Sequence, residues 1–205
     1  MACARTQAET DPMSASLAVQ QVSKSFRGLQ ALADVSFEIQ PNTITALIGP
    51  NGAGKTTLFN IMAGAQTPDH GTIVLDGCCI DGLRPDQICR LGIARTFQIV
   101  KTFAGLTVLD NVVIGALSCC TRVKDARERA DAILNNVGLG PKRNLTSALL
   151  TLSDRKLLEL ARALATRPKL LLLDEVLRRL RPTECDRLMA LLRDFKEREG
   201  ISLVL

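Results

Sequence analysis

One glycine-rich stretch constrains the fold of this chain more than any other. Residues 49–56 read GPNGAGKT. Gly49 and Gly54 flank the run PNGA, and Lys55 and Thr56 follow Gly54 directly. The residues before the stretch, 43–48, are β-branched and apolar, which predicts a buried strand. The residues after it, 55–63, carry apolar side chains at helical spacing. Strand, loop and helix together aim backbone N–H groups and the positive end of a helix at one anion.

This loop has the pattern of a phosphate-binding loop, or P-loop. Its glycines permit positive φ angles and let the backbone approach phosphates closely. Lys55 is expected to reach the β- and γ-phosphates, and the Thr56 hydroxyl to bind Mg²⁺. The alternative, a glycine-rich turn with a surface lysine, does not explain the flanking strand and helix. We therefore predict a nucleoside triphosphate site formed by Gly49, Pro50, Asn51, Gly52, Ala53, Gly54, Lys55, Thr56 and Thr57.

The composition is that of an ordinary globular protein. The chain has 205 residues, 46% hydrophobic and 23% charged, enough for one large domain or two small ones. No apolar run is long enough to cross a bilayer. Residues 1–16 are polar and unlike a signal peptide, and we expect them to form a disordered tail. The net charge is only +5, and Trp and Tyr are absent, so little is available for stacking on bases. Nucleic acid is therefore not an expected partner.

The seven cysteines do not predict a metal site. Cys78-Cys79 and Cys119-Cys120 are adjacent pairs, no C-x-x-C spacing occurs, and the single histidine, His70, cannot complete a cluster. We expect reduced thiols that act as small hydrophobic residues.

The rest of the chain alternates between predicted strands and helices. Residues 17–22 and 35–39, separated by a turn at Arg27-Gly28, predict a small antiparallel layer. Phe26 lies beside that turn, where it either stacks on an adenine ring or packs in the core. We expect further strands over residues 71–77, 170–173 and 201–205, and a strand that runs into a loop over residues 92–98. We expect helices over residues 84–90, 108–117, 125–137, 157–167 and 188–199.

This order of elements predicts an α/β fold with a mostly parallel P-loop core and an antiparallel edge layer. Residues 17–205 would form one nucleotide-binding domain, with a helical sub-domain over about residues 98–150. The last expected strand, residues 201–205, ends the chain, which suggests a C-terminal truncation. We expect that strand to be an exposed sheet edge with a tendency to associate.

A second candidate site follows the apolar run Leu170–Leu173. Such a run predicts a parallel strand covered on both faces, and ligands bind at the carboxyl ends of these strands. Asp174 is suitably placed to hold Mg²⁺ through water, and Glu175 to polarise an attacking water. A solvated strand end is the alternative, but the P-loop earlier in the chain favours the functional interpretation.

Several runs now point to a family. GLQAL, IGPNGAGKTTLFN, GIARTFQ, LTVLDNV, LLELARAL and LLLLDE occur in this order. From residue 17 onward the chain resembles the ATP-binding-cassette (ABC) ATPases, and within them the subunit that energises branched-chain amino-acid importers. The resemblance implies a homo- or heterodimer that uses ATP and Mg²⁺. It would work as a peripheral protein on the cytoplasmic face of integral-membrane permease subunits.

The resemblance also implies roles for individual residues. Thr56, Gln98 and Asp174 would serve the metal, and Gln98 would also relay the nucleotide state to the membrane subunits. Glu175 would be the catalytic carboxylate. An aromatic residue at the position of Phe26 would stack on adenine.

The sequence departs from the family at the signature motif. There the family has Leu-Ser and then a glycine whose N–H faces the γ-phosphate on the second subunit. Here Leu152-Ser153 runs directly into Asp154, so that glycine is missing although Ser153 stays a candidate nucleotide contact. Its loss would weaken stabilisation of the transition state.

Two further departures follow Glu175. Arg178, Arg179 and Arg181 stand where two subunits normally pack closely, and no switch histidine follows residues 201–205. Two functions from different classes therefore remain: an ATP-hydrolysing importer subunit, or a nucleotide-binding module with lost or strongly reduced ATPase activity. A nucleic-acid-associated cassette ATPase is a poorer hypothesis, because GIARTFQ and LTVLDNV are importer-like.

Overall fold

The computed structural model describes residues 16–96, 102–174 and 181–205. Its strands are β1 (Leu17–Phe26), β2 (Leu29–Ile39), β3 (Ile44–Thr45), β4 (His70–Leu75), β5 (Cys78–Cys79), β6 (Ile93–Thr96), β7 (Leu170–Leu173) and β8 (Ser202–Val204). Its helices are α1 (Lys55–Met62), α2 (Pro85–Arg90), α3 (Val108–Ala116), α4 (Val123–Asn136), α5 (Leu152–Ala165) and α6 (Pro182–Glu199), with short 3-10 turns at Gly140–Lys142 and Ser147–Leu149.

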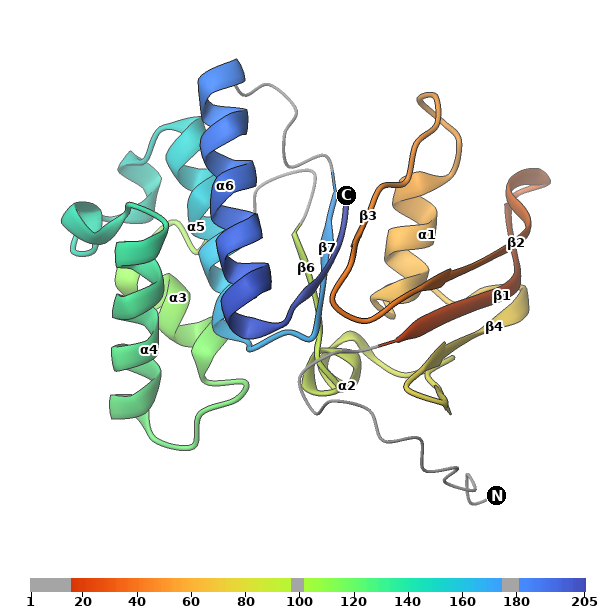
Figure 1. Ribbon diagram of the computed structural model, residues 1–205, viewed down its shortest axis with the longest axis horizontal. Helices are drawn as coiled ribbons and strands as arrows, with labels where there is room; N and C mark the ends of the chain where they lie inside the picture. Colours follow the sequence, from red (N-terminus) through yellow and green to blue (C-terminus); the bar gives the residue numbers. More distant parts are fainter. Residues whose placement is uncertain (1–15, 97–101, 175–180) are drawn as a thin grey trace.

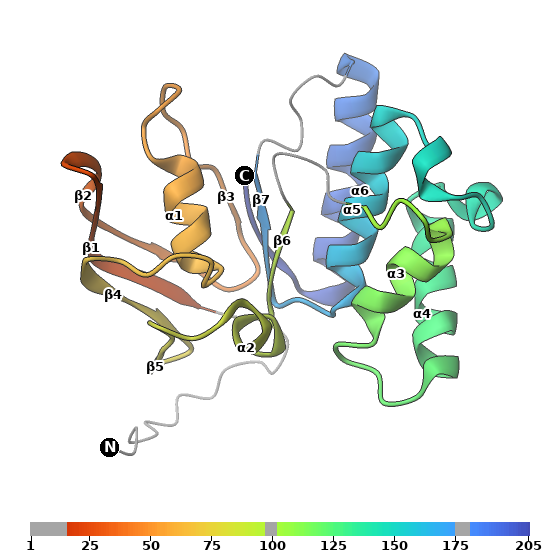
Figure 2. The same ribbon diagram turned by 180° about the vertical axis from the view of Figure 1, so that it is seen from behind.

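Two sheets confirm the predicted α/β fold. Strands β2, β1, β4 and β5 form an antiparallel sheet, and β3, β8, β7 and β6 form a parallel sheet in that order. The parallel sheet stands in the middle of the molecule, between α1 with the antiparallel sheet on one side and α3, α4, α5 and α6 on the other (Figures 1 and 2). The sequence-predicted antiparallel layer and parallel core are therefore both present.

The four leucines of β7 show how the parallel sheet holds these layers together. Each of them is 0–1% exposed. Leu170 and Leu172 pack in one core cluster with α1 and the antiparallel sheet, while Leu171 and Leu173 pack in another with the helices of the far side. Because successive side chains of a strand point to opposite faces, an unbroken apolar run is what a doubly covered strand requires.

Polar contacts reinforce the helical side. Asn111 of α3 is fully buried, and its amide nitrogen donates to the carbonyl of Phe103 at 3.1 Å. Arg129 of α4 donates to the carbonyls of Leu164 and Ala165 at the C-terminal end of α5, at 2.9 and 3.0 Å. A cation at that end satisfies carbonyls that have no partner within the helix. The contacts of Arg129 hold α4 against α5 without the help of a ligand.

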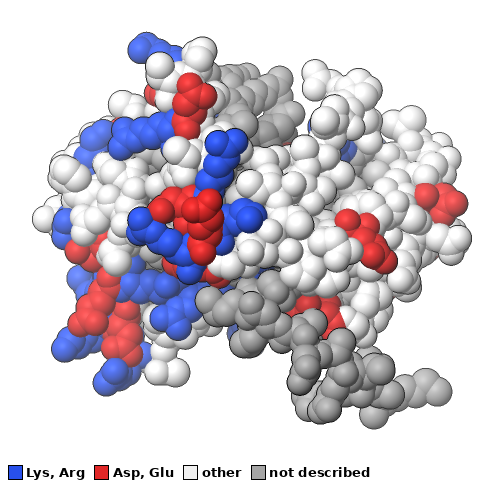
Figure 3. Space-filling view, in the orientation of Figure 1, with Lys and Arg blue, Asp and Glu red and all other residues white. Residues whose placement is uncertain are grey.

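Charged side chains gather on the same side of the molecule. Lys, Arg, Asp and Glu intermingle over the helices in Figure 3, whereas the visible face over β1, β2 and α1 is largely uncharged. Within the described ranges, every helix is too short or too polar to cross a bilayer.

The strand that leads into the P-loop is shorter than predicted. We expected residues 43–48, but β3 covers only Ile44–Thr45, and Ile48 is 94% exposed. The cause lies in pairing, since within the described residues β3 is an edge strand that pairs with β8 alone, and β8 is itself short. The Leu47 N–H still donates to the Leu205 carbonyl at 2.7 Å, after which the backbone leaves the sheet.

The expectation of an exposed edge at residues 201–205 is wrong. Strand β8 lies between β3 and β7, and Ile201 and Leu203 are fully buried. Both neighbouring strands come from earlier in the chain, which sequence order alone did not reveal. The edges of the parallel sheet are β3 and β6.

This position makes a mutation in β8 costly. Leu203→Ala is expected to lower the free energy of unfolding by about 2–5 kcal/mol, because it leaves a cavity in the middle of the sheet. Leu149→Ala serves as the control, since Leu149 is 75% exposed and its loss should change stability by about 0.5 kcal/mol or less. Urea denaturation measures both, and equal small effects would contradict the interior position of β8.

Candidate functional site

The glycine-rich loop connects β3 to α1 and owes its shape to the neighbouring β2. Gly54 is the N-cap of α1 and has a φ of 83°, in the left-handed region. A Cβ at this position would lie 2.3 Å from the carbonyl oxygen of Ala31 and 2.7 Å from a methyl group of Leu32. Glycine is therefore required here both by the backbone angle and by the close approach of β2.

The N-terminus of α1 is suited to an anion. No side chain caps this end, and the first turn contains no acidic residue. Its N–H groups and the positive end of its dipole are therefore available to a phosphate. Lys55 Nζ lies over the loop and donates to the carbonyls of Gly49 and Pro50 at 2.6 and 2.9 Å. The charge of Lys55 is thus held over the loop that precedes α1, and its contact with the β- and γ-phosphates stays a prediction.

Asp174 follows β7 and forms a buried ion pair. Its Oδ2 accepts from Arg95 Nη2 at 2.9 Å, and the two side chains are only 3% and 6% exposed. Arg95, on β6, also donates to Asn60 Oδ1 of α1. The ion pair therefore connects the strand that carries Asp174 to the helix that follows the P-loop.

The site elements share one edge of the molecule. The loop before α1, the β1–β2 turn and the carboxyl ends of β6 and β7 all lie along the upper edge in Figure 1. Thr56 is exposed and Thr57 half-buried at this edge. Phe26 is 39% exposed beside the β1–β2 turn, with Lys24 Nζ 5.7 Å from its ring centroid, so it is not a core residue.

Two predicted residues, Gln98 and Glu175, lie outside the described residues. The last described residues before them are Thr96 of β6 and Asp174 after β7, and Thr96 pairs with Leu173 in the parallel sheet.

The donor set here suits magnesium. The hydroxyl of Thr56 and the carboxylate of Asp174 are hard oxygen ligands, the type that Mg²⁺ prefers. Among the described residues, no group of three or more His, Cys, Asp and Glu side chains comes together as a metal cluster. A soft-metal site is therefore not supported by the described part of the chain, while a phosphate-linked Mg²⁺ needs few protein ligands.

The shortened signature forms a second, differently built helix end. Thr151 is the N-cap of α5 and accepts from the N–H of Asp154 at 3.2 Å, and its hydroxyl donates to Asp154 Oδ2 at 2.8 Å. Lys142 donates to the same carboxylate oxygen at 2.5 Å. Burial opposes ionisation of Asp154, but the hydrogen bonds from Lys142 and Thr151 outweigh it and hold its pKa below the usual range.

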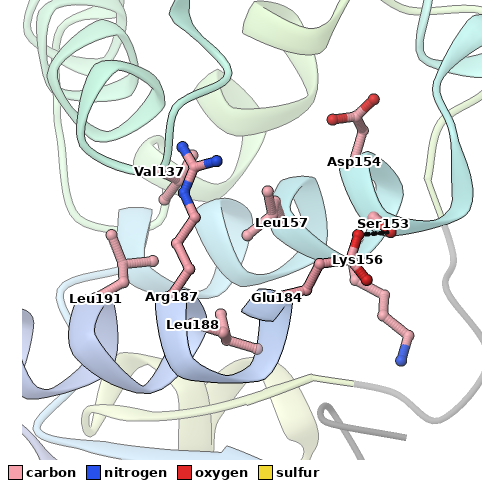
Figure 4. A pocket seen from close by; sticks show the side chains of 9 residues that line it. All are labelled: Val137, Ser153, Asp154, Lys156, Leu157, Glu184, Arg187, Leu188 and Leu191. Atoms are coloured by element: carbon pink, nitrogen blue, oxygen red, sulfur yellow. Dashed lines mark hydrogen bonds between the residues drawn. The ribbon is translucent and has the colours of Figure 1, made fainter. Parts of the chain in front are cut away.

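Ser153 is bound within its own chain. Its hydroxyl donates to Glu184 Oε1 of α6 at 2.9 Å, the contact drawn in Figure 4. The pKa of Glu184 is lowered, first by the Arg181 backbone N–H and then by the Ser153 hydroxyl. The small cavity between α5 and α6, about 140 Å³, is lined by Lys156 and Arg187 as well as by Asp154 and Glu184. Its charges balance, so this cavity does not resemble an anion site.

A larger cleft runs beside the edge strand β6. It has a volume of about 490 Å³ and lies between α2 on one side and α3 and α5 on the other. Its wall is mostly apolar and includes Phe103 and Ile114, which are 45% and 41% exposed. Arg162 of α5 lies over the Phe103 ring at 4.7 Å, and Arg95 of β6 also lines the cleft.

The match to known proteins agrees with this geometry. A family model described as ABC transporter matches residues 32–178, from β2 to the segment after Asp174. The chain belongs to the ABC transporter family. The resemblance inferred from the sequence is confirmed.

Two curated relatives of this ABC-family chain are ATP-binding proteins for the transport of different solutes. The high-affinity branched-chain amino acid transport ATP-binding protein LivG of Escherichia coli (strain K12) is 35% identical over 204 residues, covering 92% of this chain and 80% of the relative. The phosphonates import ATP-binding protein PhnC of Thiobacillus denitrificans is 36% identical over 198 residues, covering 92% and 76%. Import ATP-binding subunits for different solutes are thus about equally similar to the chain.

Two solved structures share the fold. The ADP conformation of an ATP-binding cassette of an ABC transporter has a TM-score of 0.82 at 28% identity, covering 93% of this chain and 80% of that one. A dimeric post-hydrolysis cassette bound to ADP and Pi has a TM-score of 0.83 at 25% identity, covering 92% and 86%. Cassettes of this family therefore bind adenine nucleotide, and at least one of these relatives is a dimer.

Sequence reasoning missed three residues that shape these sites. Arg95 was read only as part of a motif, and Asn60 and Glu184 were not singled out at all. The signal for Arg95 was available, because it is a charged residue within the short apolar strand Ile93–Thr96. No comparable signal marks Glu184, since the cavity between α5 and α6 exists only in the folded chain.

The helix end at Asp154 generates a pH-dependent prediction. Asp154→Asn should lower the free energy of unfolding at pH 7 by about 1 kcal/mol, as for loss of a cap contact. Because folding lowers the pKa of Asp154, its stabilisation is fully present above the unfolded value of about 3.9 and is lost as the pH falls through the lower folded value. Urea denaturation from pH 7 to pH 3 should therefore show the difference shrinking.

The control for this series is Glu128→Gln, which removes a carboxylate that is 68% exposed and lies 3.9 Å from Lys124. It should have little effect at either pH. A difference between Asp154→Asn and the parent that stays constant down to pH 3 would show that the carboxylate does not act in this way.

Proposed function

We propose that this chain is the ATP-binding subunit of an importer for branched-chain amino acids. The observation that carries the proposal is the α1 helix end, where no side chain competes for the N–H groups and Lys55 is held beside them. A second cassette subunit and membrane permease subunits complete the transporter, and the chain works on the cytoplasmic face of the membrane. What supports this solute is the likeness of the runs GIARTFQ and LTVLDNV to the branched-chain subfamily, together with LivG and the related BraF of Pseudomonas aeruginosa at 35% and 33% identity.

The nucleotide is bound by the loop and the start of α1. Backbone N–H groups from Gly49 to Thr57 surround the phosphates, and Lys55 leaves its loop carbonyls to meet the β- and γ-phosphates. Phe26 offers its exposed ring to the adenine. Pro50, Asn51 and Ala53 shape the loop between the glycines.

Thr56, Gln98 and Asp174 would hold the Mg²⁺, which would supply charge neutralisation for the phosphates. Glu175 accepts a proton from the attacking water and thereby orients it toward the γ-phosphate. Ser153 faces the nucleotide of the second subunit once its bond to Glu184 is released. The apolar cleft beside β6 offers a membrane partner a surface to cover.

Nucleotide binding tests the first step. Lys55→Ala removes the cation beside the phosphates and should weaken Mg-ATP binding by about 1.5–3 kcal/mol, the range for a charged hydrogen bond. Lys124→Ala is the matched control, because Lys124 is 84% exposed on α4, away from the P-loop. Isothermal titration calorimetry compares the three proteins. Equal affinities for Lys55→Ala and the parent would remove the basis for this assignment.

A second candidate function rests on the α5 end. Ser153 is tied to Glu184, and the first turn of α5 carries the carboxylate of Asp154. Both features oppose the role that the family's signature plays toward the second subunit's nucleotide. They favour a nucleotide-binding module that closes on ATP but hydrolyses it slowly.

Turnover distinguishes the two functions. We expect phosphate release barely above background, since loss of one oxyanion-type donor costs about a hundred- to a thousand-fold in rate. Inserting a glycine-containing pair after Ser153 should restore it only in part, because Asp154 remains. A phosphate-release assay measures this, with Glu175→Gln as the blank. Steady turnover of about 1 s⁻¹ or more, abolished in that blank, would show a working ATPase and dismiss the second function.

A further inference from the structure

We propose that Arg95 is a positioning residue that presets Asp174 for the metal of the nucleotide site. The inference deepens the proposed function and rests on it, because it concerns the same Mg-ATP. The sequence predicted no role for Arg95. This residue lies on β6, far from the P-loop in sequence.

The contacts of Arg95 join three elements of the fold. From β6, its Nη2 donates to Asp174 Oδ2 after β7 at 2.9 Å, and its Nη1 donates to Asn60 Oδ1 of α1. The guanidinium also lies 5.9 Å from the ring centroid of Phe59, the residue before Asn60. One side chain thus fixes the distance between the helix that begins at the P-loop and the carboxylate after β7.

Burial makes this arrangement obligatory. Arg95 and Asp174 are 6% and 3% exposed, so neither charge has water as a substitute partner. Separating a buried pair leaves an uncompensated charge, which is strongly unfavourable. The pair therefore stays together without nucleotide and holds the carboxylate in one orientation.

The geometry leaves Asp174 able to serve a second cation. Arg95 engages only Oδ2, and within the described residues the other carboxylate oxygen accepts no hydrogen bond. Mutation of a group that hydrogen-bonds a metal ligand and so orients it typically lowers metal affinity 10- to 100-fold. Arg95 would have this effect on Asp174 without touching the metal itself.

The planar fork of arginine is needed for the two acceptors. Nη1 and Nη2 point to acceptors on two different elements at once, whereas the ammonium of lysine is a single point charge. Arg95→Lys therefore keeps the charge and removes the geometry. Asn60→Ala removes only the α1 end of the network and is the milder variant.

The experiment measures how much Mg²⁺ improves ATP binding. Calorimetric titrations with ATP are made in Mg²⁺ and in EDTA, and the ratio of the two affinities is compared among variants. We expect the ratio to fall about tenfold in Arg95→Lys and less in Asn60→Ala, with the EDTA affinity changed less than about twofold. Arg162→Lys is the control, since Arg162 lines the same cleft but lies over Phe103, and its ratio should match the parent.

The outcomes separate this inference from the proposed function. A ratio in Arg95→Lys equal to or above that of the parent means that Arg95 does not preset Asp174, and the inference is wrong. If Arg95→Lys does not fold by circular dichroism, the ratio for Asn60→Ala decides in the same way. A parent chain that binds no ATP in either buffer refutes the proposed function, and the inference falls with it. A fall in Arg162→Lys as large as in Arg95→Lys also overturns it.

Discussion

The burial of β7 on both faces is the constraint on which the rest of the structure depends. Its leucines send alternate side chains into two separate core clusters, one shared with α1 and one with the helical side. Asp174 follows directly at the carboxyl end of this strand. Packing and the proposed chemistry are therefore joined in one short segment, because the strand that holds the layers together is followed directly by Asp174, the proposed metal ligand.

The N-termini of α1 and α5 present the same backbone groups in opposite chemical environments. At α1 no side chain caps the N–H groups, and a lysine lies beside them. At α5 a threonine cap and an aspartate in the first turn already satisfy the helix end. The first arrangement attracts an anion and the second excludes one. The proposal of nucleotide binding and the question of hydrolysis follow from this contrast.

Much of the fold could be read from the sequence, and the reasons are local. The run Leu170–Leu173 and the glycine pattern before Lys55 are short-range signals, and both elements form where they were predicted. The place of β8 was not predictable in this way, because its neighbours β3 and β7 are brought to it by the sheet order. The same limit hid Arg95 and Glu184, whose partners are 79 and 31 residues away in sequence.

The missing Cβ of Gly54 has a wider consequence for how this architecture is assembled. The Ala31 carbonyl of β2 occupies the space where a Cβ of residue 54 would lie. The antiparallel sheet therefore limits the conformations that the loop can adopt. The conformation of the loop thus depends on both sheets, and the parallel sheet alone would not provide the contact with β2. A displacement of β2 would therefore also displace the backbone of the glycine-rich loop.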